Sequence, residues 1–361
     1  MRLDHFSTSI HSARPAWPTE AAASRYNRAH SPFPFLRITV TSSAFPPCRV
    51  LVVGAGAIGS FYGSLLQTQG AEVSVVCRSE REAVSRDGFH IESKRLSDRV
   101  FRPAQTLGSV ADYQGGPPDF LILSVKVVEG TDRAALIRDA VGPQTAIVLI
   151  ENGVEIEEEI AASFPDNELI SALAFVQVSR VGPGKVKHFA YGDLTFGNYP
   201  SGLSERSRQL GAMLDSAGIK STLTEDVVTG RWQKCLWNAV FNPISVLGGV
   251  LDTGHILSGA EGEAFVRRAM QEVCAIAAAT GHPLPPALID QFIEGTRKAP
   301  PYKTSMALDY ENGRPMETEV ILGNAVRAGR REKVAIPALE SLYALMKMVE
   351  LKQASSSTPQ G

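Results

Sequence analysis

The sequence predicts an α/β fold, in which an N-terminal Rossmann-type, doubly wound parallel sheet is followed by an all-helical C-terminal domain. Three observations support this prediction. A strand-like apolar run leads into the pattern G-x-G-x-x-G over residues 49–59, which is how such a sheet opens. Apolar runs then alternate with helical patterns up to about residue 198. Beyond about residue 224 only helical periods remain.

The glycine pattern predicts a site for a nucleotide cofactor. After the strand 49–53, Gly54 permits the tight turn, Gly56 lets the backbone approach a pyrophosphate, and Gly59 lets the next helix pack closely. The helix-like run 60–69 directs its N-terminal amides at the phosphates. The predicted cofactor-binding residues of this loop are Gly54, Ala55, Gly56, Ala57, Ile58 and Gly59.

The end of the second predicted strand, 72–76, indicates which cofactor binds. NAD and FAD sites place an acid there, about 20 residues after the glycines, for the ribose 2′-hydroxyl. This chain instead has Cys77 followed by Arg78, with Arg81 close behind. A guanidinium can pair with a 2′-phosphate that a carboxylate would repel. The sequence therefore favours NADPH and disfavours FAD, with Arg78 as the phosphate contact. The alternative is an ordinary solvated arginine at a strand end.

Local patterns place the remaining elements. Further buried strands are expected at 120–125 and 145–150, and a hairpin between 169 and 196 with its turn at Gly-Pro-Gly 182–184. Helices are expected over 227–240, 261–280, 286–294, 320–330 and 337–351. We therefore predict an extension at 1–47, a cofactor-binding Rossmann domain at 48–224, a helical domain at 225–352, to which the motifs described below assign substrate binding and catalysis, and a disordered tail at 353–361.

Composition and charge exclude several classes of function. The 361 residues carry a formal net charge of −2, with a pI near 6.4, so no basic surface for nucleic acid or for an anionic membrane is expected. No apolar run approaches the ~20 residues that cross a bilayer. The cysteines stand far apart in the sequence, so we predict neither a metal site nor a disulfide framework.

Residues 1–47 differ in composition from the rest of the chain. They contain several arginines and serines but no lysine, which resembles a mitochondrial transit peptide. However, Pro15, Pro18, Pro32 and Pro34 interrupt any long amphipathic helix, and a disordered extension has a similar composition. We expect a cytoplasmic protein, with mitochondrial targeting as the alternative.

Two polar residues directly follow predicted strands, at the sheet edge where doubly wound folds bind ligands. Lys126 follows the strand 120–125, and Asn152 follows the strand 145–150. Both are candidates to face a cofactor or a substrate carboxylate. A surface lysine and a turn-forming Asn-Gly pair are the ordinary alternatives.

The first predicted helix of the C-terminal domain carries a polar stripe. Lys234, Asn238 and Asn242 are spaced i, i+4, i+8, which places them on one helix face, while the opposite face is apolar. Asn has a low propensity for helix interiors, so two Asn residues on one helix face are typical of a functional site. An exposed stripe on an amphipathic helix is the alternative.

Taken in order, these motifs resemble the ketopantoate reductases, which are NADPH-dependent 2-dehydropantoate 2-reductases. The resemblance covers about residues 49–351 and rests on Ala57-Ile58-Gly59, Ser124-Val125-Lys126, Glu151-Asn152-Gly153, the Lys234/Asn238/Asn242 helix, Ser305-Met306 and Gly313-Arg314-Pro315-Met316-Glu317. It implies a Rossmann domain joined to a helical domain, with the active site in the cleft between them. It also implies catalytic roles for Lys234 and Glu317, substrate contacts at Asn152, Asn238, Asn242 and Ser305, and cofactor contacts at Lys126 and Asn152.

The sequence departs from this family directly after Glu317. Members commonly read Ile-Asp-Tyr-(Ile/Leu)-Asn-Gly, whereas this chain has Glu319 in place of the Asp and Leu322 in place of the Asn. We expect the hydrogen bonds around the site to differ, which leaves the identity of the substrate open.

The residue types indicate a mechanism. Reduction of a ketone leaves negative charge on oxygen, which an ammonium group both stabilises and protonates, and Lys234 is the candidate. We expect a small-molecule 2-oxo acid as partner, ketopantoate first, and keep a homodimer open. A reductase of another 2-oxo acid would share every motif. A non-catalytic NADPH sensor would need neither Lys234 nor Glu317.

Overall fold

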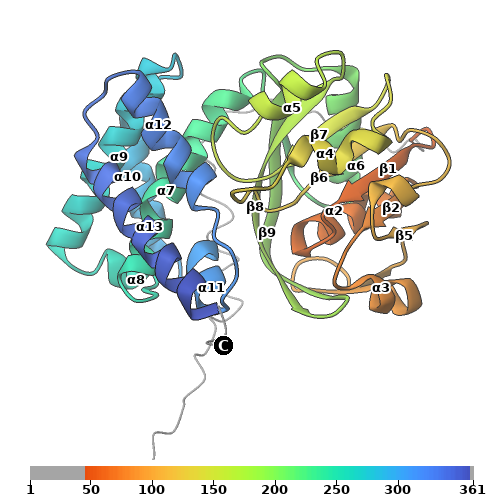
Figure 1. Ribbon diagram of the computed structural model, residues 1–361, viewed down its shortest axis with the longest axis horizontal. Helices are drawn as coiled ribbons and strands as arrows, with labels where there is room; N and C mark the ends of the chain where they lie inside the picture. Colours follow the sequence, from red (N-terminus) through yellow and green to blue (C-terminus); the bar gives the residue numbers. More distant parts are fainter. Residues whose placement is uncertain (1–44, 358–361) are drawn as a thin grey trace, which may run out of the picture.

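A ten-stranded mixed sheet forms the N-terminal half of the protein, and a group of helices forms the C-terminal half (Figure 1). The computed structural model describes residues 45–357. Most of the extension expected at 1–47, with its targeting alternative, and residues 358–361 of the expected tail therefore lie outside the described residues. The two-part α/β architecture predicted from the sequence is confirmed.

The sheet has the order β4-β3-β9-β8-β7-β6-β1-β2-β5, with β10 paired to β9. From β5 to β8 all neighbours are parallel, while β8 and β9 form a long antiparallel hairpin. The strands are β1 Arg49–Val53, β2 Glu72–Val76, β3 Phe89–Ser93, β4 Arg99–Phe101, β5 Thr106–Leu107, β6 Phe120–Leu123, β7 Ala146–Ile150, β8 Leu169–Gly182, β9 Lys185–Asn198 and β10 Ser221–Leu223. The chain order reverses between β1 and β6, which is where doubly wound sheets bind ligands.

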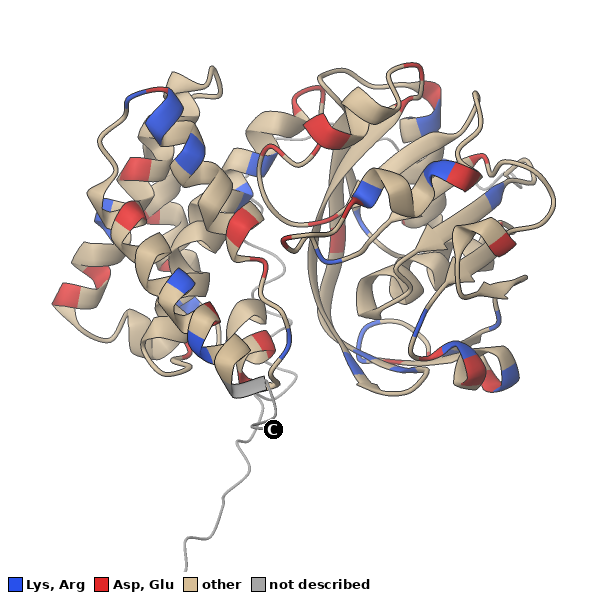
Figure 2. Ribbon diagram, viewed as in Figure 1, with Lys and Arg blue, Asp and Glu red and all other residues tan. Residues whose placement is uncertain are grey.

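Helices cover both faces of the parallel strands. In β1, Val50 and Val52 pack with α2 and α6, whereas Leu51 and Val53 pack on the opposite face with α4. The inner strands therefore read as continuous apolar runs: β1 and β2 each have one charged residue, at the first position, and β6 and β7 have none (Figure 2). The helices of this half are α2 Ala57–Thr68, α3 Arg81–Asp87, α4 Arg133–Ile137, α5 Glu158–Ser163 and α6 Glu205–Ser216, with short 3-10 turns at Val110–Asp112 and Arg138–Ala140.

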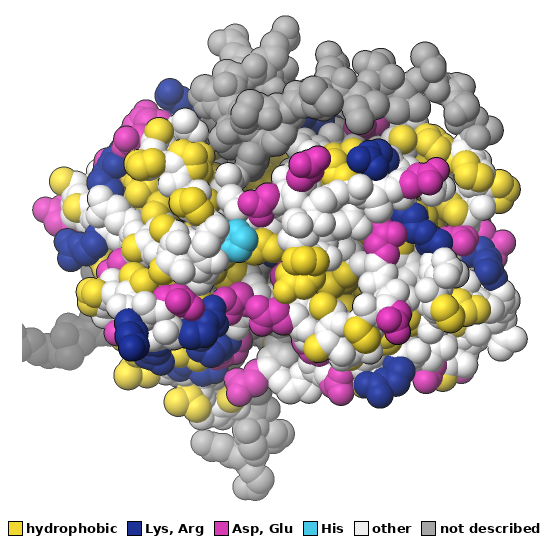
Figure 3. Space-filling model, turned by 90° about the horizontal axis from the view of Figure 1, so that it is seen from above, with side chains coloured by type: hydrophobic (Ala, Val, Ile, Leu, Met, Phe, Trp, Pro, Cys, Tyr) yellow, Lys and Arg dark blue, Asp and Glu magenta, His cyan; other side chains and the backbone are white. Residues whose placement is uncertain are grey.

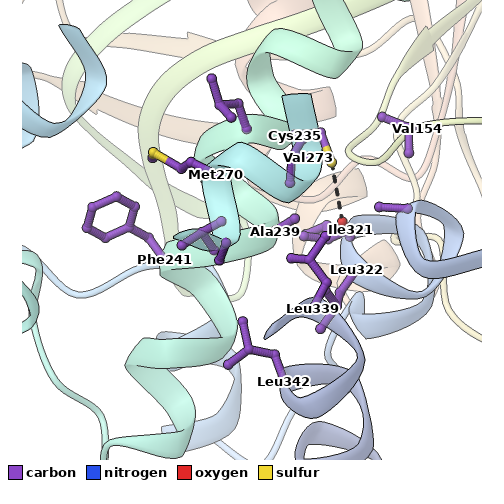
Figure 4. Packing of buried hydrophobic residues seen from close by; sticks show 14 of the residues in the cluster. Val154, Cys235, Ala239, Phe241, Met270, Val273, Ile321, Leu322, Leu339 and Leu342 are labelled. Carbon is purple, nitrogen blue, oxygen red and sulfur yellow. Dashed lines mark hydrogen bonds between the residues drawn. The ribbon is translucent and has the colours of Figure 1, made fainter. Parts of the chain in front are cut away.

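The C-terminal half packs around α7, Val227–Leu247, which contacts α8, α9, α11 and α13. Asp226 caps this helix, because its Oδ1 accepts a hydrogen bond from Thr229 N at 2.9 Å. The other elements are α8 Thr253–Ile256, α9 Ala260–Ala279, α10 Ala287–Lys298, α11 Ser305–Glu311, a π-helical turn η3 at Glu319–Gly323, α12 Asn324–Arg331 and α13 Pro337–Ser357. Figure 4 shows the apolar core that joins them.

Several elements differ from the sequence prediction. Helix α7 continues past the expected end at Val240, through Pro243, because Val246 is still buried in the helical core. Helix α13 extends to Ser357, so the predicted disordered tail at 353–361 is wrong for its first residues. The short elements β3, β4, α3, α8 and α11 were not predicted, because each spans too few residues to show a period.

Loops from the sheet complete the core of the helical half. Val127, after β6, and Val154 and Ile156, after β7, belong to the same apolar cluster as α7 and α13; Figure 4 labels Val154 and Ile321 of η3 among the residues of this cluster. Gly153 has φ +104°, and a Cβ there would lie 2.6 Å from the carbonyl oxygen of Val320. The two halves are therefore joined at the carboxyl end of β7 by contacts that need a glycine.

The surface carries charges of both signs. On the face seen in Figure 3, Lys and Arg lie interspersed with Asp and Glu. Among residues 45–357, no helix has the length and apolar character needed to span a bilayer. Within the same described range, no cluster of three His, Cys, Asp or Glu side chains is arranged to hold a metal ion.

We expect Gly153→Ala to destabilise the protein more than Gly70→Ala. Both positions have positive φ, but a Cβ at Gly70 meets no atom within 4 Å, whereas one at Gly153 meets backbone. Backbone strain costs about 1–3 kcal/mol at either site, and the contact with Val320 adds about 1–3 kcal/mol at Gly153 alone. Thermal melts of both variants measure the difference, and equal melting temperatures would contradict the close approach.

Candidate active site

One cavity of about 1900 Å³ lies between the carboxyl ends of the parallel strands and the helical half. Its lining comes from the loops after β1, β2, β6 and β7, from the β8–β9 hairpin, and from α7, α10 and α11. Ligand pockets are typically about 300–1,000 Å³, so this space can hold a dinucleotide together with a small substrate.

The glycine loop lies at one end of the cavity, at the beginning of α2. A Cβ on Gly54 would meet Val125 at 2.7 Å, and one on Gly59 would meet Ser124 Oγ at 2.5 Å. A Cβ on Gly56, in contrast, would meet nothing within 4 Å. Gly54 and Gly59 are therefore required by protein packing, while Gly56 leaves open space at the cavity.

The amino terminus of α2 can receive an anion. Its N-cap is Gly56, which provides no side-chain hydrogen bond, and its first turn contains no acid. The first amides of the helix therefore keep their capacity to bind phosphate. Gly54, Ala55, Gly56, Ala57 and Ile58 line the cavity, whereas Gly59 lies behind them against Ser124. These residues fit the pyrophosphate of a dinucleotide.

Arg78 lines the cavity directly after β2 and is exposed, as expected of a residue that meets a ligand there. Arg81 begins α3 and is absent from the lining. The sequence analysis missed Glu80, a buried acid that also lines this end. Glu80 is already paired, because it accepts from Arg180 at 2.9 Å and from Gly184 N at 3.2 Å. Its charge is thus compensated by the β8–β9 hairpin.

Lys234 lies on α7 and lines the cavity. Its Nζ donates to Asn152 Oδ1 at 3.0 Å and to the carbonyl oxygen of Ala174 at 2.9 Å, and it lies 5.5 Å from the ring centre of Phe175. Burial is the main cause that lowers the pKa of Lys234 to about 8, and the neighbouring Arg231 lowers it further. The ammonium is therefore poised to lose its proton slightly above neutral pH.

Asn152 and Glu317 complete a hydrogen-bonded chain with Lys234. Asn152 Nδ2 donates to Glu317 Oε2 at 2.9 Å, while Glu317 Oε1 accepts from Val127 N at 3.2 Å. Burial raises the pKa of Glu317, and the hydrogen bonds from Asn152 and Val127 oppose that rise. One amide thus links an ammonium from the helical half to a carboxylate that precedes η3.

Lys126 reaches across the cavity to the helical half. Its Nζ forms an ion pair with Asp309 Oδ2 at 2.6 Å and donates to the carbonyl oxygen of Pro315 at 3.2 Å. Asp309, on α11, also accepts from Arg314 at 2.9 Å. The sequence analysis missed Asp309, although it stands one helical turn after Ser305, which was predicted. Lys126 therefore lies where the two halves meet.

The remaining predicted substrate contacts divide into two groups. Asn238 and Ser305 line the cavity with Lys234 and Glu317. Asn242 does not: it is 1% exposed, and its amide has no hydrogen-bond partner among the described residues. The i, i+4, i+8 stripe is therefore divided in this structure, because α7 runs from the cavity into the helical core.

The two departures from the family pattern lie away from the cavity. Glu319 accepts hydrogen bonds from Arg327, Tyr343 and Lys347 at 2.7–3.1 Å, while Leu322 is fully buried in the helical core. Neither residue lines the cavity. The expected change in hydrogen bonding is therefore located among η3, α12 and α13.

Comparison with known proteins gives a consistent relationship over most of the chain. The family model described as Ketopantoate reductase PanE/ApbA matches residues 50–201, and the one described as Ketopantoate reductase PanE/ApbA C terminal matches residues 226–350. A 2-dehydropantoate 2-reductase of Nostoc sp. is 32% identical over 308 residues, covering 84% of this chain and 95% of that protein.

Solved structures agree with this relationship. The crystal structure of 2-dehydropantoate 2-reductase from Methylococcus capsulatus is 57% identical, with a TM-score of 0.82, and the match covers 87% of this chain and 99% of that one. A ternary structure of D-mandelate dehydrogenase with NADH and anilino(oxo)acetate shares the fold at 20% identity and a TM-score of 0.76, covering 85% of this chain and 98% of that one. The chain therefore belongs to the ketopantoate reductase family of nicotinamide-dependent oxidoreductases.

Proposed function

We propose that the protein reduces 2-dehydropantoate (ketopantoate) to pantoate with NADPH, a reaction of pantothenate and coenzyme A biosynthesis. The observation that carries this proposal is the linked set Lys234, Asn152 and Glu317 in one cavity with the glycine loop and Arg78. An ammonium, a neutral amide and a carboxylate at one place suit a ketone that must gain a proton.

The proposed cofactor site uses residues that lie at one end of the cavity. The α2 terminus with Gly54, Ala55, Gly56, Ala57 and Ile58 would hold the pyrophosphate, and Arg78 would pair with the 2′-phosphate. When bound, NADPH supplies the hydride. We assign Gly59 a packing role, because it lies behind this loop and does not face the cavity. A phosphate held by Arg78 favours NADPH over NADH, because NADH lacks the group.

The proposed chemistry assigns the proton to Lys234. Negative charge that develops on the substrate oxygen attracts the ammonium, which then donates its proton from Nζ. Asn152 fixes the ammonium by accepting one of its hydrogen bonds, and Ala174 accepts another. The third N–H remains for the substrate oxygen.

The proposed substrate contacts match the groups of a hydroxylated 2-oxo acid. Ser305, Asn152 and Lys126 can donate to a carboxylate, while Asn238 and Glu317 can bond the distal hydroxyl. Asn242, which the sequence predicted as a further contact, is not among them, because it is buried outside the cavity lining.

A reductase of another 2-oxo acid is the second candidate. The observation in its favour is the aromatic part of the lining: Trp237 and Tyr302 stack with ring centres 6.0 Å apart, and Phe175 and Phe292 line the same cavity. A non-catalytic NADPH sensor is disfavoured, because it has no need for the hydrogen-bonded chain Lys234–Asn152–Glu317. The boundary between the two domains at 224/225 stays a prediction, and so does the formation of a homodimer.

Initial rates of NADPH oxidation with a panel of 2-oxo acids test the proposal. We expect ketopantoate to give the highest kcat/KM. A higher value for an aromatic 2-oxo acid would replace ketopantoate as the substrate, and no oxidation with any member would remove the catalytic function.

We expect Lys234→Ala to lower kcat by about 10²–10⁴-fold, the range typical of a lost acid catalyst, with NADPH binding retained. Lys220→Ala is the matched control, because Lys220 also lines the cavity but makes no contact with Asn152 or Glu317. Steady-state rates and NADPH titrations check both variants. Turnover of Lys234→Ala near that of the wild type would rule out the assignment.

We expect Arg78→Ala to weaken NADPH binding by about tenfold to a hundredfold, which corresponds to the ~1.5–3 kcal/mol of a charge-assisted contact, while NADH binding stays nearly unchanged. Arg81→Ala serves as the control, since Arg81 lies outside the lining. Paired Kd titrations measure the effect. Equal losses for the two nucleotides would point to a different phosphate contact.

We expect Glu317→Gln to reduce kcat/KM more for ketopantoate than for 3,3-dimethyl-2-oxobutanoate, which lacks the distal hydroxyl. A buried carboxylate–hydroxyl hydrogen bond is worth roughly 1.5–3 kcal/mol, or about tenfold to a hundredfold. Measuring both substrates with both proteins gives the coupling. If both substrates lose the same factor, Glu317 acts on Lys234 through Asn152 instead.

A further inference from the structure

Arg231 contacts the peptide groups on both sides of Asn152. It lies on α7, three residues before Lys234, and is 1% exposed. Its Nη1 donates to the carbonyl oxygen of Glu151 at 2.9 Å and to that of Gly153 at 3.2 Å. One guanidinium group therefore holds the backbone immediately before and after the residue that links Lys234 to Glu317.

The Nε atom of this guanidinium is bonded to side chains of the N-terminal half. It donates to Glu157 and to Ser171 Oγ, the latter at 2.8 Å. Ser171, on β8, in turn donates to Glu157 Oε1 at 2.6 Å, and all three side chains are buried. Nη2 has no hydrogen-bond partner among the described residues. Because Nε and Nη1 are both bonded, the planar group cannot rotate without breaking several hydrogen bonds.

We propose that Arg231 is a positioning residue for the reduction: by holding the carbonyl groups of Glu151 and Gly153, it fixes the Asn152 amide between Lys234 and Glu317. Arg231 lies outside the cavity lining, so it acts through Asn152 and does not touch the substrate. Its kinetic test rests on the proposed function, because the rate measured is that of 2-oxo acid reduction.

Arg231 also affects the charge of Lys234. The charged groups near Lys234 are Arg231 from its own helix and Glu317 from the segment before η3. The neutral groups that face it are the amide of Asn152 after β7 and the carbonyl of Ala174 and ring of Phe175 from β8. Burial and Arg231 lower the pKa of Lys234 to about 8, and Glu317 opposes them. Since the protonated lysine is the proposed acid, the reduction rate should fall as pH rises through about 8.

A purely structural role is the competing explanation, because loss of one partner from a buried ion pair destabilises a protein strongly whatever its function. Arg133 provides a matched control. It is also buried and pairs with Glu151 Oε2 at 2.8 Å and with Glu159 at 2.7 Å, but it contacts neither of the two carbonyls that flank Asn152.

The first test compares Arg231→Lys with Arg133→Lys. Each keeps a positive charge but loses the forked geometry. We expect Arg231→Lys to lower kcat by about 10–100-fold, as a small displacement of a catalytic group does, with NADPH affinity within about twofold of the wild type. Arg133→Lys should lower the melting temperature by a similar amount and keep kcat within about threefold of the wild type. Unchanged kcat in Arg231→Lys, or equal losses in both variants, would overturn the proposal.

The second test needs no substrate. The rate at which acetic anhydride labels Lys234 is followed against pH by peptide mass spectrometry, for the wild type and for the double variant Arg231→Met with Glu157→Gln, which removes Arg231 together with the carboxylate that it pairs with. We expect the wild-type midpoint near pH 8 and a rise of at least about half a pH unit in the variant. An unchanged midpoint would overturn the inference that Arg231 lowers the pKa of Lys234. A wild type inactive toward every 2-oxo acid would overturn the proposed function while this measurement still reports on Arg231.

Discussion

The side-chain amide of Asn152 is the interaction on which the site depends. A carboxamide can accept and donate at the same time, and here it accepts from Lys234 and donates to Glu317. Its two partners come from two separate segments of the helical half, α7 and the residues before η3, whereas Asn152 itself follows a strand of the sheet. The cavity therefore has its present form only when the two halves are joined at this residue.

An amide between the two charged groups has an electrostatic consequence. A direct ion pair would stabilise the ammonium of Lys234 and raise its pKa. With Asn152 in between and Arg231 nearby, burial dominates, and the pKa of Lys234 falls to about 8. A general acid is most effective when its pKa lies close to the working pH, so the same geometry that fixes the lysine also brings its proton into a useful range.

The join between the halves is built from backbone as much as from side chains. Val154 N donates to the carbonyl oxygen of Val320 at 3.2 Å, and Asn324 donates to that of Val154 at 2.7 Å. Val320 belongs to the π-helical turn that follows Glu317, and π turns of this kind are frequent at functional sites. The close approach of Gly153 to this turn explains why a glycine follows Asn152.

The sequence by itself determined the features that depend on local rules. The glycine loop follows from backbone sterics, the strands β1, β2, β6 and β7 from continuous apolar runs, and the face shared by Lys234 and Asn238 from the helical period. Only the tertiary structure decided the pairing of Asn152 with Glu317, of Lys126 with Asp309, and of Arg231 with the backbone around Asn152. These partners are remote in sequence, so they depend on how the two halves dock. The same reason explains Asn242: periodicity places a residue on a helix face, but the packing of neighbouring helices decides whether that face lines the cavity or the core.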